Sequence, residues 1–434
     1  MSVGNGHAPG RRTADTTSTV EFFVGKGGVG KTTLACAAAI GHAQRGRRVL
    51  VASIDQAHSV ADAFGITIAR MPGTTAGIHR VTERLDAVEI DSLALLEQRF
   101  RDTTRLIAAG GRHEHGFDLT ALDPAELTGL PGVQELLALA EVVELAGSDE
   151  WDIVIVDCGA TADLQRTIAA PATLLGYLER IWPQHERVGA AIGPDLRLAV
   201  VVATLERAVE AVTAIRDLLA DRERTTARLV TVPERVALAE AARTRSAMAL
   251  LNMRLDGVIV NKVLDQLDSA SRAPADPVVR WYRERRAGQL DIIAELERVM
   301  ADVPIVVAAH TGTEPVGLAP LGALAGTVCE ERVGVDGGVA NGAPSTVRLE
   351  SGAGVDSIYA MRMHLPLVDP ASLSLGRAED DLIVGADGVR QRVRLASVLR
   401  RCEVDSAELD GHSLVVRFRP NPAVWPQHSD GTPL

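Results

Sequence analysis

A glycine-rich segment near the amino terminus carries residue types that bind nucleotide phosphates. Its sequence is Gly25-Lys26-Gly27-Gly28-Val29-Gly30-Lys31-Thr32-Thr33. In a loop of this kind the backbone N–H groups surround the phosphates, Lys31 reaches the outer phosphates and the Thr32 hydroxyl is a ligand of Mg²⁺. An apolar run of strand length from Thr19 to Val24 enters the loop, and an alanine-rich helical stretch leaves it. The spacing and both flanks therefore predict a loop that binds ATP and Mg²⁺.

A second lysine stands near the start of this loop. One lysine is enough for the nucleotide held by its own subunit, so Lys26 is free to reach a phosphate bound by a neighbouring subunit. We therefore predict a dimer with facing nucleotides, in which Lys26 and Lys31 both act in catalysis. A solvated surface lysine is the alternative for Lys26. The string from Lys26 to Thr32 resembles the deviant-loop ATPases, which include the MinD and ParA proteins, the nitrogenase iron protein, and the ArsA-type and GET-type ATPases.

Two aspartates stand at the ends of apolar runs. Asp55 comes after the run Arg48 to Ser53, and Asp157 comes after the run Trp151 to Val156. A carboxylate at the carboxyl end of a strand faces the phosphates, where Asp55 can position the attacking water. An aspartate opposite the loop can hold a Mg²⁺-bound water, so Asp157 joins Thr32 in the predicted metal site. A helix cap is the alternative for Asp55.

The segments around both aspartates resemble those of the ArsA-type and GET-type ATPases. The string Asp55-Gln56-Ala57-His58-Ser59 is similar to the family's Asp-Pro-Ala-His-Ser switch, which implies that Asp55 is the catalytic aspartate. Gln56 replaces the family's proline, a residue that fixes one backbone angle. The segment from Asp157 to Arg166 keeps the family's threonine at Thr161 and lacks its proline and its Gly-His pair.

Two later positions are candidates for contacts with the base. Pro233-Glu234 follows one predicted strand, and Asn261 ends the next. An asparagine side chain can both donate to and accept from an adenine edge. In the GET-type family a Pro-Glu pair and an Asn in equivalent strands contact the nucleotide, so the resemblance implies this role for Glu234 and Asn261. An exposed loop carboxylate is the alternative for Glu234.

Short apolar runs alternate with longer helical stretches through most of the chain. Such runs indicate strands buried on both faces, and the helices between them indicate α/β architecture with a doubly wound, mostly parallel sheet. Residues 19–329 are predicted to form this ATPase domain, with a helical insertion at about 60–145. The resemblance to the ArsA-type and GET-type ATPases extends over about Val20 to Cys329. After the strand that enters the loop, the predicted strands are Arg48–Ser53, Trp151–Val156, Leu198–Val202, Ala227–Val232, Gly257–Val260 and Pro304–Val307.

The carboxyl-terminal part of the chain differs from the rest in residue composition and in the spacing of its apolar residues. Residues 330–354 are rich in glycine and predict a flexible linker. Residues 355–420 alternate with period two, as in a small antiparallel β-sandwich, and their order of strands resembles an α-crystallin-like (small heat-shock) domain. A generic β appendage is the alternative. Residues 1–18 and 421–434 are predicted to be tails, the first of them disordered. The predicted strands of this domain are Tyr359–Pro366, Asp381–Gly385, Arg390–Leu395 and Ser413–Phe418.

The composition limits the classes of function. A net charge of −12 argues against general affinity for nucleic acid, so no nucleic-acid partner is expected. The four cysteines are scattered, as expected in a reducing cytoplasm. No cysteine lies between Lys262 and Gln289, where eukaryotic GET-type factors carry a zinc clasp, so no zinc-bridged dimer is expected. No apolar run approaches the roughly 20 residues that span a bilayer, so any membrane contact is expected to be peripheral.

The sequence leaves two classes of function open. The first is an ATP-gated dimer, homotypic or formed with a paralogue, that binds hydrophobic or membrane-destined client proteins and hands them over. The second is a positioning or regulatory switch of the MinD or ParA kind, whose usual marks are a terminal amphipathic helix or a basic face for DNA. Because the stretch Pro420 to Pro426 is broken by prolines and cannot form such a helix, we favour the first class. An arsenite pump ATPase is less favoured, since the sequence has no cysteine cluster.

Overall fold

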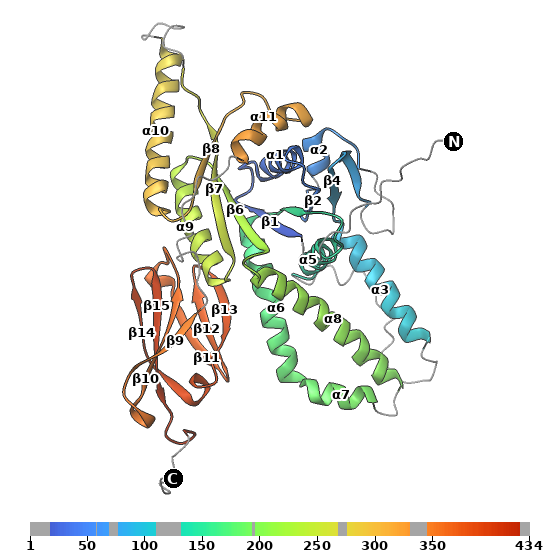
Figure 1. Ribbon diagram of the computed structural model, residues 1–434, viewed down its shortest axis with the longest axis vertical. Coiled ribbons are helices and arrows are strands. Elements are labelled where there is room, and N and C mark those ends of the chain that lie inside the picture. Colours follow the sequence, from blue (N-terminus) through green and yellow to red (C-terminus); the bar gives the residue numbers. More distant parts are fainter. Residues whose placement is uncertain are drawn as a thin grey trace, which may run out of the picture.

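The computed structural model describes residues 18–57, 59–68, 77–109, 132–192, 196–267, 276–329 and 345–425 of the chain. The larger part is a sheet of eight strands with helices on both faces, and the smaller part is a β domain that lies against two of these helices (Figure 1). The α/β architecture with a carboxyl-terminal antiparallel domain, predicted from the sequence, is therefore confirmed.

The eight-stranded sheet is parallel except for the antiparallel pair at one edge. Phe22 and Phe23 are neighbours in the chain, are both fully buried and belong to apolar clusters on opposite faces of the sheet. This two-sided burial explains the continuous apolar runs in the sequence. In spatial order the strands are β3 (His79–Thr82), β4 (Leu85–Glu89), β2 (Val49–Ser53), β5 (Ile153–Asp157), β1 (Thr19–Val24), β6 (Thr225–Thr231), β7 (Arg254–Val263) and β8 (Ile305–Ala309).

Helices cover both faces of the sheet (Figure 1). One face packs against a small group, α1 (Lys31–Gln44), α2 (Val60–Phe64) and α11 (Leu318–Val328). The larger cluster on the other face contains α5 (Val133–Ala146), α6 (Thr161–Ile181), α8 (Leu196–Ala220), α9 (Arg235–Leu250) and α10 (Pro277–Val299). Two more helices, α3 (Ser92–Ala109) and α7 (Gln184–Ile192), pack on α8 and extend away from the sheet.

One predicted strand is wrong. The run Leu198–Val202 lies inside α8, which continues to Ala220. Its branched side chains do not mark a strand because valine lowers helix propensity by only about half a kcal/mol, and packing outweighs that cost. Val202 is buried whereas its neighbour Val201 is exposed, as on the two sides of a packed helix.

The predicted helical insertion at 60–145 also needs correction, because it contains the two edge strands β3 and β4. All five residues of β4 are buried, including two carboxylates. Asp86 forms an ion pair with Arg80 and accepts a hydrogen bond from Trp151 Nε1 at 3.0 Å. These partners offset the cost of burying a charge. Charged residues can therefore occupy this buried strand, and it has no continuous apolar run from which the sequence could predict it. Residues 69–76 and 110–131 of this predicted insertion lie outside the described residues.

The β domain consists of two antiparallel sheets. One sheet has the order β14 (Cys402–Asp410), β15 (Ser413–Pro420), β10 (Ile358–His364) and β9 (Thr346–Ser351). The other has the order β11 (Ser374–Ala378), β12 (Asp381–Ala386) and β13 (Val389–Arg394). Buried side chains of both sheets, such as Met361, Val384 and Phe418, belong to one apolar cluster. Three short 3₁₀ turns, at Gly354–Asp356, Pro370–Ser372 and Leu399–Arg401, connect strands of this domain.

Three predicted boundaries shift in the structure. The strand β9 lies within the segment 330–354 that was predicted as a linker, of which residues 330–344 lie outside the described residues. Ser18, predicted as the last tail residue, is buried and donates a hydrogen bond to the Trp151 carbonyl at 2.6 Å. At the other end Trp425 lies near Tyr359, with 6.1 Å between ring centroids, so the ordered domain continues past residue 420. Residues 1–17 and 426–434 lie outside the described residues.

The β domain rests on the α/β domain through β12 and β13, which contact α9 and α6 respectively. Arg392 of β13 lies over Gly176 of α6, and a Cβ added at Gly176 would lie 2.7 Å from an Arg392 guanidinium nitrogen. The same guanidinium donates to the Asp381 carboxylate at 2.6 Å, and both side chains are mostly buried. A glycine on α6 therefore allows this ion pair to sit close to the helix backbone.

Candidate nucleotide site

The glycine-rich loop is held tightly between two strands. A Cβ at Gly25 would lie 2.3 Å from the Val230 carbonyl oxygen of β6. Gly30 has φ +95°, and a Cβ there would lie 2.4 Å from Asn261 Nδ2 of β7. Only glycine combines this left-handed backbone with so close an approach, so both glycines fix the loop against the sheet.

Two side chains at the start of α1 point from the loop into the site. Lys31 is buried, and its Nζ donates to the Lys26 carbonyl at 3.2 Å. Thr32 Oγ1 donates to Asp157 Oδ2 at 2.8 Å and lies 3.4 Å from Ser59 Oγ. The cation and the hydroxyl that the sequence assigned to phosphate and Mg²⁺ therefore lie at the carboxyl end of β5 together with the predicted metal carboxylate.

Asp157 is fully buried, and one of its carboxylate oxygens, Oδ1, has no hydrogen-bond partner among the described residues. Burial raises its pKa from 3.8 to about 7, although the Thr32 hydrogen bond and the Lys31 charge lower it. An orphaned carboxylate oxygen beside a threonine hydroxyl provides the oxygen donors that Mg²⁺ prefers. The two side chains therefore fit a Mg²⁺ site, with Thr32 and Asp157 on the same side of the loop.

Asp55 stands on the loop after β2. Its Oδ1 accepts from the Ala57 N–H at 3.0 Å, and a Cβ at Gly159 would lie 3.9 Å from its carboxylate carbon. Asp55 therefore faces the segment that follows Asp157, as expected when β2 and β5 are parallel neighbours. The carboxylate is partly exposed, which leaves it accessible to water and to a ligand.

A cavity of about 850 Å³ joins most of the predicted residues. Six of the nine loop residues line it, together with Asp55 and Asn261. Its far wall is the segment from Ala309 to Val316 after β8. The six loop residues are Gly27, Gly28, Gly30, Lys31, Thr32 and Thr33. The cavity is large enough to enclose a nucleotide.

The end of β7 contributes two adjacent polar residues to this cavity. Asn261 Nδ2 donates to the Val29 carbonyl at 2.8 Å, so its amide is tied to the loop. Lys262, which the sequence reasoning missed, has φ +60° and donates from Nζ to the Gly28 carbonyl at 2.8 Å. A lysine in this strained conformation at the wall of a cavity is a candidate contact for the nucleotide. Its position directly after Asn261, at a strand end, is the signal that could have identified it.

Of the predicted site residues that do not line this cavity, two make ion pairs with other helices. Glu234, at the start of α9, is exposed and forms an ion pair with Arg285 of α10 at 3.3 Å, beside a separate groove. The structure therefore does not bring Glu234 to the nucleotide cavity, because the first turn of α9 faces α10. Lys26 is also exposed, with 57% of its side chain accessible, and its Nζ lies 3.8 Å from Glu240 of α9.

The described residues contain neither a cluster of metal-ligating side chains nor a membrane-spanning helix. Within the described ranges no group of three or more His, Cys, Asp or Glu side chains is arranged to hold a metal ion. Among the same residues, none of the helices combines the length and apolar character needed to cross a membrane.

Comparison with known proteins identifies the family. Residues 18–330 match the family model of the ArsA anion-transporting ATPases, and residues 356–418 match the HSP20-like domain found in ArsA proteins. The Mycobacterium tuberculosis protein Rv2184c is 44% identical over 418 residues, which cover 94% of this chain and 97% of that protein. A candidate arsenical pump-driving ATPase of Aquifex aeolicus is 26% identical, with 91% of this chain and 98% of that protein covered. The ATPase GET3 of Kluyveromyces lactis is 30% identical over 293 residues, which cover 63% of this chain and 80% of that protein.

These matches cover both parts of the fold, and the family model spans the whole nucleotide cavity. Proteins of this family use ATP with Mg²⁺. The resemblance read from the loop, the two aspartates and the carboxyl-terminal strands is thus confirmed. The chain belongs to the ArsA family of anion-transporting ATPases, and it carries the HSP20-like domain found in that family.

Proposed function

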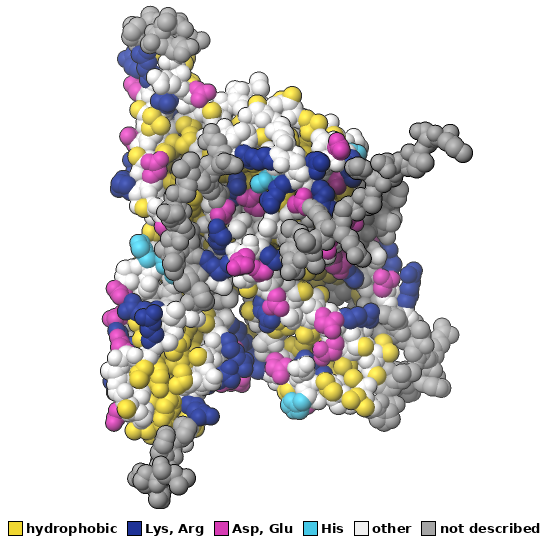
Figure 2. Space-filling view, in the orientation of Figure 1, with side chains coloured by type: hydrophobic (Ala, Val, Ile, Leu, Met, Phe, Trp, Pro, Cys, Tyr) yellow, Lys and Arg dark blue, Asp and Glu magenta, His cyan; other side chains and the backbone are white. Residues whose placement is uncertain are grey.

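We propose that this ATPase works as a dimeric switch that binds hydrophobic or membrane-destined segments of client proteins and hands them over. The observation that carries the proposal is a set of exposed apolar side chains on α6, α7 and α8. Ile181 and Ile192 are 80% and 81% exposed. Apolar residues gather in the region of these helices in Figure 2. The other large apolar side chains exposed on these helices are Leu174, Tyr177, Val188, Leu198 and Val201.

Such an apolar surface, which we call the helical lobe (α6, α7 and α8), favours contact with an apolar partner. Each exposed isoleucine forgoes roughly 1.5–3 kcal/mol of burial, so clusters of them on a folded protein usually mark a binding surface. The helical lobe also connects directly to the nucleotide site, because α6 begins at Thr161, just after the loop that follows Asp157. A change at the phosphates is therefore expected to move α6 and the surface that it carries.

Within the nucleotide site, each role follows from position. We assign Lys31 to the outer phosphates, and Thr32 with Asp157 to Mg²⁺, which when bound would neutralise phosphate charge. We assign Asp55 to the attacking water, since its partly exposed carboxylate lines the cavity and lies across from the segment after Asp157. Asn261 and the wall after β8 would hold the base.

Lys26 is assigned to the partner subunit. Its exposed ammonium is held by one weak contact with Glu240, a type of ion pair that contributes about 0–1 kcal/mol and is readily exchanged. Its side chain does not line the cavity of its own subunit. These facts support a dimer, of two identical chains or with a paralogue, in which ATP closes the interface and hydrolysis reopens it.

The cysteines favour client binding over arsenite transport. All four, Cys36, Cys158, Cys329 and Cys402, are buried. Burial raises the pKa of each thiol above its usual value. The thiolate is the form that binds soft metals and metalloids, and these thiols are both shielded and protonated at neutral pH.

The test combines trapping with a matched surface variant. Asp55→Asn is expected to hold the ATP-bound dimer, which is isolated from extract of the native host and compared by mass spectrometry with Lys31→Ala. Enrichment of proteins with transmembrane or other strongly apolar segments supports the proposal, provided that Ile181→Glu in the trapped protein removes it. Recovery of one defined membrane, septal or DNA-associated partner, insensitive to Ile181→Glu, would instead indicate a positioning switch of the MinD or ParA kind.

A further inference from the structure

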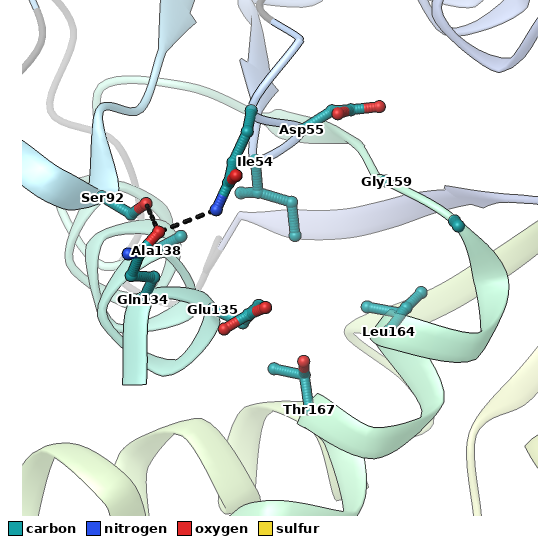
Figure 3. Close-up of a pocket in the computed structure, with 11 residues that line it drawn as sticks. Ile54, Asp55, Ser92, Gln134, Glu135, Ala138, Gly159, Leu164 and Thr167 are labelled. Atoms are coloured by element: carbon teal, nitrogen blue, oxygen red, sulfur yellow. Dashed lines mark hydrogen bonds between the residues drawn. The ribbon is translucent and has the colours of Figure 1, made fainter. Parts of the chain in front are cut away.

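A second cavity adjoins the nucleotide site and shares Asp55 with it. It has a volume of about 270 Å³ and lies between the loop after β2, the start of α5 and the start of α6 (Figure 3). Close packing against neighbours normally holds a side chain in one place. The loop that carries Asp55 borders open space on both sides, so its position depends on specific polar contacts.

The structure provides one such contact from the residue next to Asp55. Gln56 Nε2 donates to Gln134 Oε1 of α5 at 2.7 Å (Figure 3). The same oxygen lies 3.4 Å from the hydroxyl of Ser92, the first residue of α3, which donates to it. One glutamine oxygen therefore joins the Asp55 loop to two helices.

The hydrogen bond that Asp55 makes inside its own loop cannot by itself hold that loop in place. Asp55 Oδ1 accepts from the N–H of Ala57, two residues away in the same loop, so that bond moves with the loop. Gln56 does not fix its own backbone angle in the way that proline would. Among the described residues, the bond from Gln56 to Gln134 is the side-chain hydrogen bond that ties the segment 55–57 to another element of the fold.

We propose that Gln134 is a positioning residue for Asp55, holding the loop through Gln56 so that the carboxylate faces the phosphate cavity. This inference rests on the proposed role of Asp55 in orienting water. Gln134 touches neither the nucleotide cavity nor the predicted Mg²⁺ residues. Its loss should therefore lower kcat and leave KM for MgATP unchanged, because the groups that bind the phosphates stay in place.

The central test is steady-state ATP turnover of Gln134→Met, which keeps the size of the side chain and removes the acceptor. We expect kcat to fall about three- to tenfold, the effect of one neutral hydrogen bond, at constant KM. Gln134→Glu keeps an acceptor for both donors and is expected to restore turnover. Gln98→Met makes the same change on α3, away from the contact, and serves as the control.

A second substitution separates positioning from a general structural role. Gln56→Pro restrains the backbone next to Asp55 without the amide contact, so turnover in this variant should no longer respond to Gln134→Met. An undiminished kcat in Gln134→Met overturns the proposal. An equal loss in the Gln56→Pro background, or a rise in KM that matches the fall in kcat, overturns it too. Should Gln134→Met fail to fold, Gln134→Ser in both backgrounds gives the same comparison.

Measuring Asp55→Asn in parallel separates a failure of the proposed role of Asp55 from a failure of the positioning role of Gln134. Normal turnover in Asp55→Asn would remove the proposed role of Asp55 itself. Lost turnover in Asp55→Asn with full turnover in Gln134→Met would leave the role of Asp55 intact and reject only the positioning role of Gln134.

Discussion

The nucleotide site and the helical lobe depart from ordinary burial in opposite directions. At the site, the carboxylate of Asp157 is fully buried with one oxygen unpaired, whereas on the lobe Ile181 and Ile192 are about four-fifths exposed. Each departure costs stability in the free protein. The comparison agrees with the proposed function, in which each region receives something that the chain alone does not contain: a cation with phosphates at one and an apolar segment at the other.

The largest effect is expected when the chemistry of the site is removed. Lys31→Ala and Asp55→Asn should each lower ATP turnover by about 10²- to 10⁴-fold, the usual contribution of a positioned catalytic group. Lys31→Ala should also weaken nucleotide binding, whereas Asp55→Asn should keep it. Steady-state turnover and nucleotide titration measure the two properties. Normal turnover in both variants would show that this cavity is not the catalytic site. The comparison would then lose the first of its two regions.

The parts of the site that could be predicted are those whose chemistry depends on residue type and short spacing. The loop from Gly25 to Thr33 and the aspartates after two adjacent parallel strands meet in the structure because strand order alone brings them to one edge of the sheet. Glu234 could not be placed in this way, since its contacts depend on the direction of α9 relative to α10. Lys262 has the same strand-end position as Asn261, and only its backbone conformation marks it out.

Prediction of the fold from the sequence has the same limit, because residue type alone does not determine tertiary contacts. Strands buried on both faces were predicted from continuous apolar runs, and most of these runs are strands. The run Leu198–Val202 failed because the packing of a long helix outweighs the preferences of individual valines. The strand β4 was missed because Asp86 and Glu89 are buried with partners that are distant in the sequence or lie across a turn. Propensity is local, whereas these outcomes are decided by tertiary contacts.

The second prediction concerns the cost of burying Asp157. Its pKa in the folded protein, about 7, lies above the ordinary 3.8. Stability from this group is therefore fully present below about pH 4 and is lost as the pH rises through 7, by at most ~4 kcal/mol. Asp157→Asn should raise the midpoint of thermal unfolding of the nucleotide-free, Mg²⁺-free protein at pH 8 and leave it unchanged at pH 4. Equal midpoints at pH 8 would show that the carboxylate carries no such cost.

The third prediction concerns the exposed apolar side chains of the helical lobe. Ile181→Glu and Ile192→Glu should weaken binding of a synthetic transmembrane-helix peptide by about tenfold, because each removes apolar contact area from the lobe. Basal ATP turnover should stay unchanged, since neither residue lines the nucleotide cavity. Fluorescence anisotropy of the labelled peptide measures binding, and Gln184→Glu, at an exposed position of α7, controls for one added negative charge. Unaltered peptide binding in both variants would place the client surface elsewhere.

The smallest effect is expected where α6, the helix shared by the two regions, meets the β domain. Gly176→Ala places a methyl group 2.7 Å from the buried guanidinium of Arg392, so the ion pair with Asp381 must shift. The cost should be about 1 kcal/mol, after allowance for the better helix propensity of alanine.

Gly189→Ala on α7 is the matched control, because a Cβ there meets no atom within 4 Å. It should stabilise the protein by roughly 0.5–1 kcal/mol, as alanine does in an open helix position. Chemical unfolding with intrinsic fluorescence gives both values. Opposite signs for the two variants would show that the β domain restrains α6, the helix that we propose carries a nucleotide-driven movement to the apolar face. A gain in stability for both would mean that the contact with Arg392 does not restrain α6, and that the helix is held by its packing on α5, α8 and α9.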